Sequence, residues 1–165
     1  YFLSELGWMC ITANNNGITR IDFKDPPQSA HTNKGNNSDT DTTPQALHDA
    51  QQQLTEYFAG TRTTFDLPLD PAGTAFQKEV WSALVTIPYG VTCSYKDIAN
   101  QVNRPKGSQA IGQANGKNPI SIVVPCHRVI GANGSLTGYA GGLERKAELL
   151  KREKERSVQT GSLRI

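Results

Sequence analysis

Cys126 and His127 stand side by side, directly after an apolar run that ends in Pro125. A thiol is a strong nucleophile only once it is ionised, and its usual pKa of about 8.5 must be lowered by a cation, a base or a helix N-terminus. His127 is the nearest candidate base. Adjacent residues on an extended backbone point to opposite sides, so a bridging water is the expected proton relay. An inert, buried cysteine beside a structural histidine is the alternative.

A third group for such a site is expected on a final helix, predicted from about Leu143 to Glu155. The apolar residues assigned to its inner stripe are Leu143, Ala147 and Leu150. Glu153 follows Leu150 by three residues, so helical periodicity turns its carboxylate toward the apolar side, where it needs a partner. His127 could be that partner and be held in one tautomer. A solvated carboxylate at a frayed helix end is the alternative.

The element that must position the cysteine is the run from Ile120 to Val124. Its β-branched residues predict a fully buried strand, and Pro125 ends that strand because proline cannot donate a hydrogen bond to a ladder. Cys126 is therefore expected at the end of a rigid strand.

The composition excludes several classes of protein. The 165 residues suit one ordinary domain, or a small domain beside a second. Three widely spaced cysteines predict neither a disulfide framework nor a zinc site, and favour a reducing, intracellular setting. No apolar run approaches the ~20 residues of a membrane span. We therefore expect a cytoplasmic protein that needs neither a metal nor a membrane.

Charge is distributed unevenly along the chain. Residues 1–92 carry a net charge of −5 and residues 93–165 carry +7, which gives the overall +2. The thiol lies in the basic half. This asymmetry is consistent with a polyanionic partner, and a solvated basic face is the alternative.

Residues 1–72 are predicted to form a small α/β domain. A hairpin is expected at 8–23, followed by a polar mobile loop or linker at 25–42. A helix capped by Thr43 is expected at 44–59, where Gly60 ends it, and an edge strand at 65–69.

Residues 73–165 form the second predicted domain. Thr74 and Gln77 form a capping-box pattern before one helix, and Ser94 can cap the next. After a turn, Ser108 is expected to cap a third, short helix from Gln109 to Asn115. Two short helices joined by a tight turn outline a helix-turn-helix, whose second helix could approach a nucleic-acid groove closely through Ala110, Gly112 and Ala114. An ordinary helical hairpin is the alternative.

Several of these segments together carry a family signature. Pro125-Cys126-His127-Arg128-Val129-Ile130, preceded by Asn118-Pro119-Ile120 and followed by Gly138-Tyr139-Ala140-Gly141-Gly142 and Lys146, closely resembles the O6-alkylguanine-DNA alkyltransferases, the methylated-DNA–protein-cysteine methyltransferases. The match extends from about Thr74 to Glu153. It implies an N-terminal ribonuclease-H-like α/β domain followed by a mainly helical, winged-helix-like DNA-binding domain.

The resemblance also implies a reaction and its residues. Cys126 would take a methyl or larger alkyl group from O6-alkylguanine or O4-alkylthymine in double-stranded DNA, and each molecule would act once, without a cofactor. His127 would deprotonate Cys126 through a water, Glu153 would orient His127, and Asn118 would support the backbone. Tyr95 would help to flip the nucleotide and would donate toward the departing base. The pocket would be built by Val129, Tyr139 and Ala140.

DNA contacts follow from the same resemblance, in the minor groove and with little dependence on sequence. The positions implied are Tyr95, Gln109, Ala110, Gly112, Asn115 and Arg128. Gln109 stands where the family usually has an arginine finger, and Ser4-Glu5-Leu6-Gly7 replaces the usual Ser-Pro-Leu-Gly. A monomer is expected, with clustering on one duplex left open.

Three other functions fit parts of the sequence less well. A lesion-binding protein of the same fold would lack the cysteine, and Cys126 is present. A thiol-sensing regulator would need an additional domain, for which the chain has no room. A cysteine hydrolase is disfavoured because a flipping tyrosine and a groove-binding helix are predicted where a peptide cleft would be expected.

Overall fold

The computed structural model describes residues 1–27 and 44–162, and it divides into two compact units, Tyr1–Ala72 and Gly73–Ile165. Most of the loop predicted at 25–42, and the Thr43 cap, lie outside the described residues. In the part of the chain that is described, no helix is both long and apolar enough to span a membrane.

The first unit is built on a three-stranded antiparallel sheet in the order β1 (Phe2–Ser4), β2 (Gly7–Asn14) and β3 (Gly17–Phe23). The predicted hairpin is confirmed as β2 and β3, with Asn14 opposite Gly17. The Asn14 side chain closes the turn by accepting hydrogen bonds from the backbone N–H of Asn16 (2.8 Å) and Gly17 (3.0 Å). Strand β1 was not predicted, because three residues are too few for a periodic signal.

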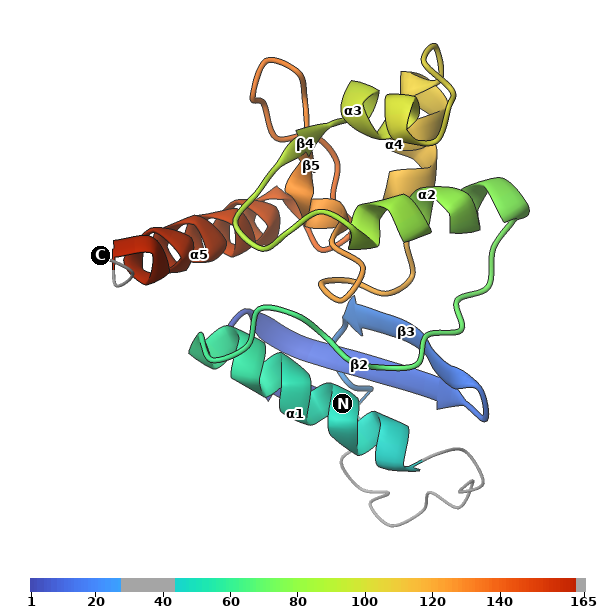
Figure 1. Cartoon of the computed structure of the whole chain (residues 1–165). Helices are drawn as coiled ribbons and strands as arrows, with labels where there is room; N and C mark the ends of the chain where they lie inside the picture. Colours follow the sequence, from blue (N-terminus) through green and yellow to red (C-terminus); the bar gives the residue numbers. More distant parts are fainter. Residues whose placement is uncertain (28–43, 163–165) are drawn as a thin grey trace. The chain divides into compact units, whose positions relative to one another are not determined.

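Helix α1 (Pro44–Ala59) covers one face of this sheet (Figure 1). It buries Ala50, Leu54, Tyr57 and Phe58, and it ends at Gly60, whose φ of 86° suits a helix C-terminus. The predicted edge strand at 65–69 is reduced to one parallel bridge between Ile18 and Leu69. Pro68 lacks an N–H and can offer only its carbonyl, which accepts from Ile18 N at 2.8 Å.

The second unit begins with three helices, α2 (Ala75–Val85), α3 (Tyr95–Gln101) and α4 (Ser108–Gly116), which pack against one another (Figure 1). Both expected caps are present: Thr74 and Ser94 each form a reciprocal capping box, with Gln77 and Asp97 respectively. The predicted Ser108 cap is wrong. Helix α4 begins one residue earlier than expected, and its cap is Gly107, which has no side chain to bond the helix start.

A parallel pair of very short strands, β4 (Cys93–Ser94) and β5 (Val129–Ile130), connects the helices to the cysteine segment. Strand β4 leads directly into Tyr95, and β5 follows directly after η2 (Cys126–Arg128), a turn of 3-10 helix. This pairing fixes the start of α3 beside the segment that carries the thiol.

Helix α5 (Leu143–Ser162) presents a different face to the core from the one predicted. Leu143 is 49% exposed, whereas Lys146, Leu149 and Glu153 are at most 1% exposed. Of the residues predicted to face inward, Leu143, Ala147, Leu150 and Glu153, only Glu153 is buried. The buried stripe instead contains two charged residues, because other elements of the unit supply their partners.

Candidate active site

The backbone that leads to Cys126 is a series of turns and not the predicted strand. Residues 121–124 form turns, and Ile122 has a φ of 72°, which is rare for a β-branched residue. The Asn118 side chain holds this shape: its Nδ2 donates to Val124 O (2.9 Å) and Ile120 O (3.3 Å), and its Oδ1 accepts from Ile120 N (3.0 Å). The run is buried, as expected, but its polar backbone groups are satisfied by an amide side chain in place of neighbouring strands.

His127, Arg128 and Glu153 form a buried cluster behind the thiol. Oε2 of Glu153 lies 2.8 Å from His127 Nε2. Arg128 donates to both oxygens of the same carboxylate, through Nε at 2.8 Å and Nη2 at 3.0 Å, and its Nη1 donates to Ile87 O at 2.7 Å. Glu153 therefore turns inward, as helical periodicity predicted. It contacts two side chains where one was expected, and its Oε1 also accepts from the backbone N–H of Gly90 at 3.4 Å.

These contacts determine which histidine nitrogen carries the proton. Burial alone would raise the pKa of Glu153, but the hydrogen bonds and charges of His127 and Arg128 lower it to about 2. Burial lowers the pKa of His127, in spite of the opposing effect of Glu153. An ionised carboxylate can only accept, so Nε2 of a neutral His127 must be its donor. Nδ1 is then left as an unprotonated acceptor, and it is buried without a hydrogen-bond partner among the described residues.

Cys126 itself is 5% exposed and is the first residue of η2. Burial raises the pKa of its thiol, while a hydrogen bond with Asn118 and the positive charge of Lys146 act in the opposite direction. At neutral pH the resting cysteine is thus a thiol, and it needs a base to become a nucleophile.

An ordinary thiol has a pKa of about 8.5. In the absence of DNA, we expect the reactivity of Cys126 to keep rising at pH values above this one. The raised pKa keeps the thiolate a minority species at neutral pH. The measurement is the rate of carbamidomethylation of the Cys126 peptide by iodoacetamide between pH 6 and 10, with a free cysteine peptide as the reference. A Cys126 profile that levels off below that of the reference peptide would contradict a raised pKa.

Lys146, which belongs to the family signature, has a structural role that the sequence did not predict. Its fully buried ammonium donates to the carbonyl oxygens of Val129 (2.7 Å), Thr137 (2.6 Å) and Gly138 (3.5 Å). It therefore ties β5 to the loop at 131–142. A lysine three residues before Leu149 and seven before Glu153 could have been identified from its place on the buried stripe.

The residues predicted to build the pocket belong to β5 and to this loop. Val129 is fully buried, and the Tyr139 ring lies edge-on to His127, with 6.5 Å between the ring centroids. The Tyr139 hydroxyl is buried, and burial raises its pKa. Ala140, in the same loop, is exposed.

The residues predicted to contact DNA fall into two groups. Tyr95 is half-buried, with its hydroxyl 2.6 Å from Thr137 Oγ1, and Gln109 and Ala110 are exposed on α4. By contrast, Asn115 is 4% exposed and its Nδ2 donates to Cys126 O at 3.5 Å. Arg128 is 5% exposed, and Glu153 and Ile87 already engage its guanidinium. Arg128 was expected to contact DNA, but a buried ion pair with Glu153 holds it inside the protein.

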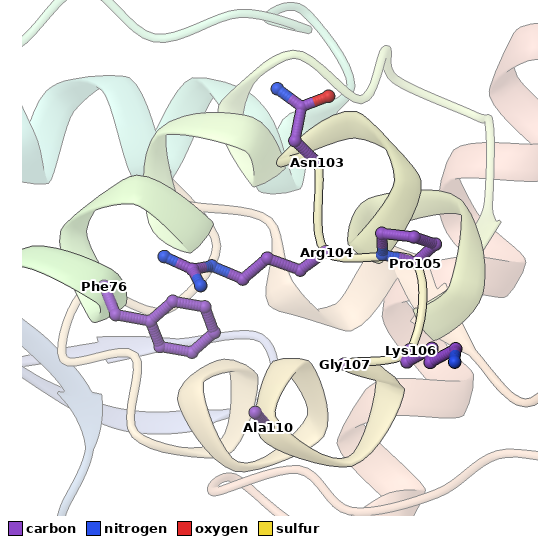
Figure 2. Close-up of a pocket in the computed structure, with 7 residues that line it drawn as sticks. All are labelled: Phe76, Asn103, Arg104, Pro105, Lys106, Gly107 and Ala110. Atoms are coloured by element: carbon purple, nitrogen blue, oxygen red, sulfur yellow. The ribbon is translucent and has the colours of Figure 1, made fainter.

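A groove of about 630 Å³ lies beside the turn between α3 and α4 (Figure 2). The Arg104 guanidinium stacks over the Phe76 ring, 5.0 Å from its centroid, and Ala110 of α4 lines the same groove. The lining also includes Lys106, so the turn presents basic side chains next to the exposed face of α4. Within the described residues, no group of His, Cys, Asp and Glu is arranged to hold a metal ion.

A thiol followed by a buried histidine and carboxylate, on a unit whose short helices α3 and α4 are joined by a tight turn, is the arrangement expected of a cysteine-dependent protein that acts on nucleic acid. Comparison with known proteins agrees with this class. Residues 75–155 match the family profile described as "6-O-methylguanine DNA methyltransferase, DNA binding domain", and residues 1–71 match that of the ribonuclease-like domain of the same family.

Individual relatives are similar over much of their length. A methylated-DNA–protein-cysteine methyltransferase of Mycobacterium tuberculosis is 58% identical over 114 residues, which is 69% of each chain. A constitutive one from Bacillus subtilis is 49% identical over 160 residues, 92% of each chain. The crystal structure of M. tuberculosis OGT in complex with DNA gives a TM-score of 0.79 at 46% identity, over 94% of this chain and 91% of that one. The chain belongs to the methylated-DNA–protein-cysteine methyltransferase family.

Proposed function

We propose that this protein repairs alkylated DNA by transferring the alkyl group from O6 of guanine, or O4 of thymine, to the sulfur of Cys126. The observation that carries the proposal is the buried Cys126–His127–Glu153 arrangement in a chain of this family. Family membership supports the reaction class, and the 2.8 Å contact between His127 and Glu153 supports the roles proposed for these residues.

The proposed chemistry begins with the thiol proton. Nδ1 of His127 is the free acceptor, and it takes the proton of Cys126 through a water. The sulfur then forms a bond to the alkyl carbon as the bond from carbon to O6 breaks, and its electron pair stays with the guanine. The proton that left the thiol ends on the released base. Glu153 stabilises the imidazolium that forms in between.

The thioether product explains why one turnover is expected. A general base does not break a carbon–sulfur bond to a simple alkyl group, so the thiol is not restored after transfer. The protein would therefore be consumed as it repairs. None of these steps calls for a cofactor, and one monomer contains all the residues that they need.

Access to the damaged atom requires the base to leave the duplex, because a buried thiol cannot reach O6 within the stack. We propose that α4 binds in the minor groove, with Gln109 filling the vacated space and the small residues Ala110 and Gly112 allowing close approach. Tyr95, at the start of α3, would crowd the backbone of the flipped nucleotide and donate toward its base.

The test is the intact mass of the protein after incubation with a duplex that contains O6-methylguanine. We expect a gain of one methylene group per molecule, located by fragmentation on the Cys126 peptide, and guanine restored in the DNA. Unmodified protein bound to the duplex would support a lesion sensor instead. Unmodified duplex is the control substrate.

Replacing Gln109 with arginine is expected to tighten DNA binding by up to about tenfold, which corresponds to ~1.4 kcal/mol. Arginine also adds charge and stacking area that glutamine lacks. The measurement is the Kd for an O6-methylguanine duplex at fixed salt. Gln113→Arg, which adds the same charge one turn further along α4, is the matched control, with a smaller gain expected. An unchanged or weaker affinity for Gln109→Arg would contradict the finger role.

A further inference from the structure

The hydrogen bond between Tyr95 and Thr137 joins the two parts of the site that must cooperate in repair. Tyr95 begins α3, and Thr137 lies in the loop at 131–142 that also carries Tyr139. Their hydroxyl oxygens are 2.6 Å apart, and either can be the donor. We infer that Thr137 is a positioning residue that holds Tyr95 ready to donate to the departing base. This inference rests on the proposed alkyl transfer.

Thr137 is itself firmly held, which is what a positioning residue requires. Its backbone carbonyl accepts from Nζ of Lys146 at 2.6 Å, and the same ammonium donates to Val129 O. Val129 belongs to β5, directly after the segment that carries Cys126. The Thr137 hydroxyl is therefore fixed relative to the reactive sulfur through a buried lysine.

Tyr95 is held from two further sides. Strand β4, which immediately precedes it, pairs with β5, so that Ser94 lies opposite Ile130. Its ring lies over Gly112 of α4: a Cβ atom added at Gly112 would meet two ring carbons of Tyr95 at 3.8 Å, an ordinary contact distance. The phenol thus spans from the proposed DNA-binding helix to the loop that contains Tyr139.

The chemistry of the pair suits a donor that must change partners. A phenol is a stronger acid than an aliphatic alcohol, so in the resting protein Tyr95 donates and Thr137 accepts. When a flipped base accepts the phenol hydrogen, the Thr137 hydroxyl can rotate and donate to the phenol oxygen. Tyr95 keeps a hydrogen-bond partner in both states, and the returned hydrogen bond makes it a better donor to the base as negative charge develops there.

The test uses Thr137→Val, which removes the hydroxyl and keeps the shape, and Thr137→Ser, which keeps the hydroxyl. Alkyl transfer from an O6-methylguanine duplex is followed in single turnovers over a range of DNA concentrations. One hydrogen bond contributes an amount that corresponds to about a three- to tenfold change in rate. We expect Thr137→Val to lower the maximal transfer rate by that factor without changing the half-saturating DNA concentration, and Thr137→Ser to react within about twofold of the wild type.

A second pair of variants separates positioning from general damage to the loop. In a Tyr95→Phe background the hydroxyl of Thr137 has nothing to position, so we expect Thr137→Val to slow transfer no further. Equal slowing with and without the Tyr95 hydroxyl, or a serine variant as slow as the valine variant, would overturn the inference. A full rate for Thr137→Val would overturn it as well. Failure of the wild-type protein to take up any alkyl group would instead refute the proposed function.

Discussion

Changing Cys126 to alanine is expected to abolish alkyl uptake, from one group per protein molecule to none, while DNA binding persists. The sulfur is the acceptor atom, so no neighbouring group can replace it, and the groups proposed to hold DNA lie on α3 and α4. The measurements are the intact mass after exposure to an O6-methylguanine duplex and the Kd for the same duplex. Because Cys126 is only 5% exposed, its loss leaves a small internal space and little change at the surface.

The chain supplies matched controls in its two other cysteines. Cys10 and Cys93 are both free and partly exposed, and neither belongs to the cluster of His127 and Glu153. Cys10→Ala and Cys93→Ala should therefore still take up one alkyl group. Uptake by Cys126→Ala, or loss of DNA binding with that change alone, would contradict the separation of the chemical and the binding roles.

Replacing Glu153 with glutamine is expected to have the largest effect on stability. It leaves the guanidinium of Arg128 buried without its carboxylate, and breaking a buried ion pair in this way costs about 3–5 kcal/mol. The side-chain oxygen of glutamine can still accept a hydrogen bond from Arg128. We therefore expect urea unfolding to show a loss in the free energy of unfolding near the lower end of this range. Transfer should also slow by at least about tenfold, because His127 loses the charge that stabilises its protonated form.

The matched control is Glu148→Gln, five residues earlier on α5. Glu148 pairs with Arg152 at 2.9 Å, but its side chain is 38% exposed, and such surface pairs contribute little to stability because solvent screens them. The double variant Arg128→Gln/Glu153→Gln should recover part of the loss, since no buried charge then remains unpaired. Equal destabilisation by Glu148→Gln and Glu153→Gln would contradict the buried pair.

The same carboxylate predicts how stability depends on pH. The pKa of Glu153 is about 2 in the folded protein, against about 4.3 for an unperturbed glutamate. The stabilisation is therefore fully present above the unfolded value and is lost as the pH falls from about 4 to 2, by a total on the order of 3 kcal/mol. Urea unfolding between pH 6 and 3 should show a steeper decline for the wild type than for Glu153→Gln.

Much of the local structure follows from the sequence alone. The capping boxes at Thr74 and Ser94, the hairpin around Asn14 and the helix that ends at Gly60 are each specified by residues within a few positions of one another. Such signals depend on local hydrogen bonds and on backbone preferences, which do not require the rest of the fold. The nearness of a nucleophile, a base and a carboxylate was also predictable, because helical periodicity turned Glu153 inward.

Only the tertiary structure decided where the charges of the second unit are held. Arg128 was expected at DNA, and it is paired with Glu153, 25 positions along the chain. Lys146 was an unassigned member of a motif, and it holds three carbonyls around the loop at 131–142. The apparent strand before Cys126 is a set of turns held by Asn118. A sequence pattern shows which residues are apolar, but a buried polar group pairs with whichever group the fold brings near it. The partners of Arg128, Lys146 and Asn118 therefore could not be predicted from the sequence alone.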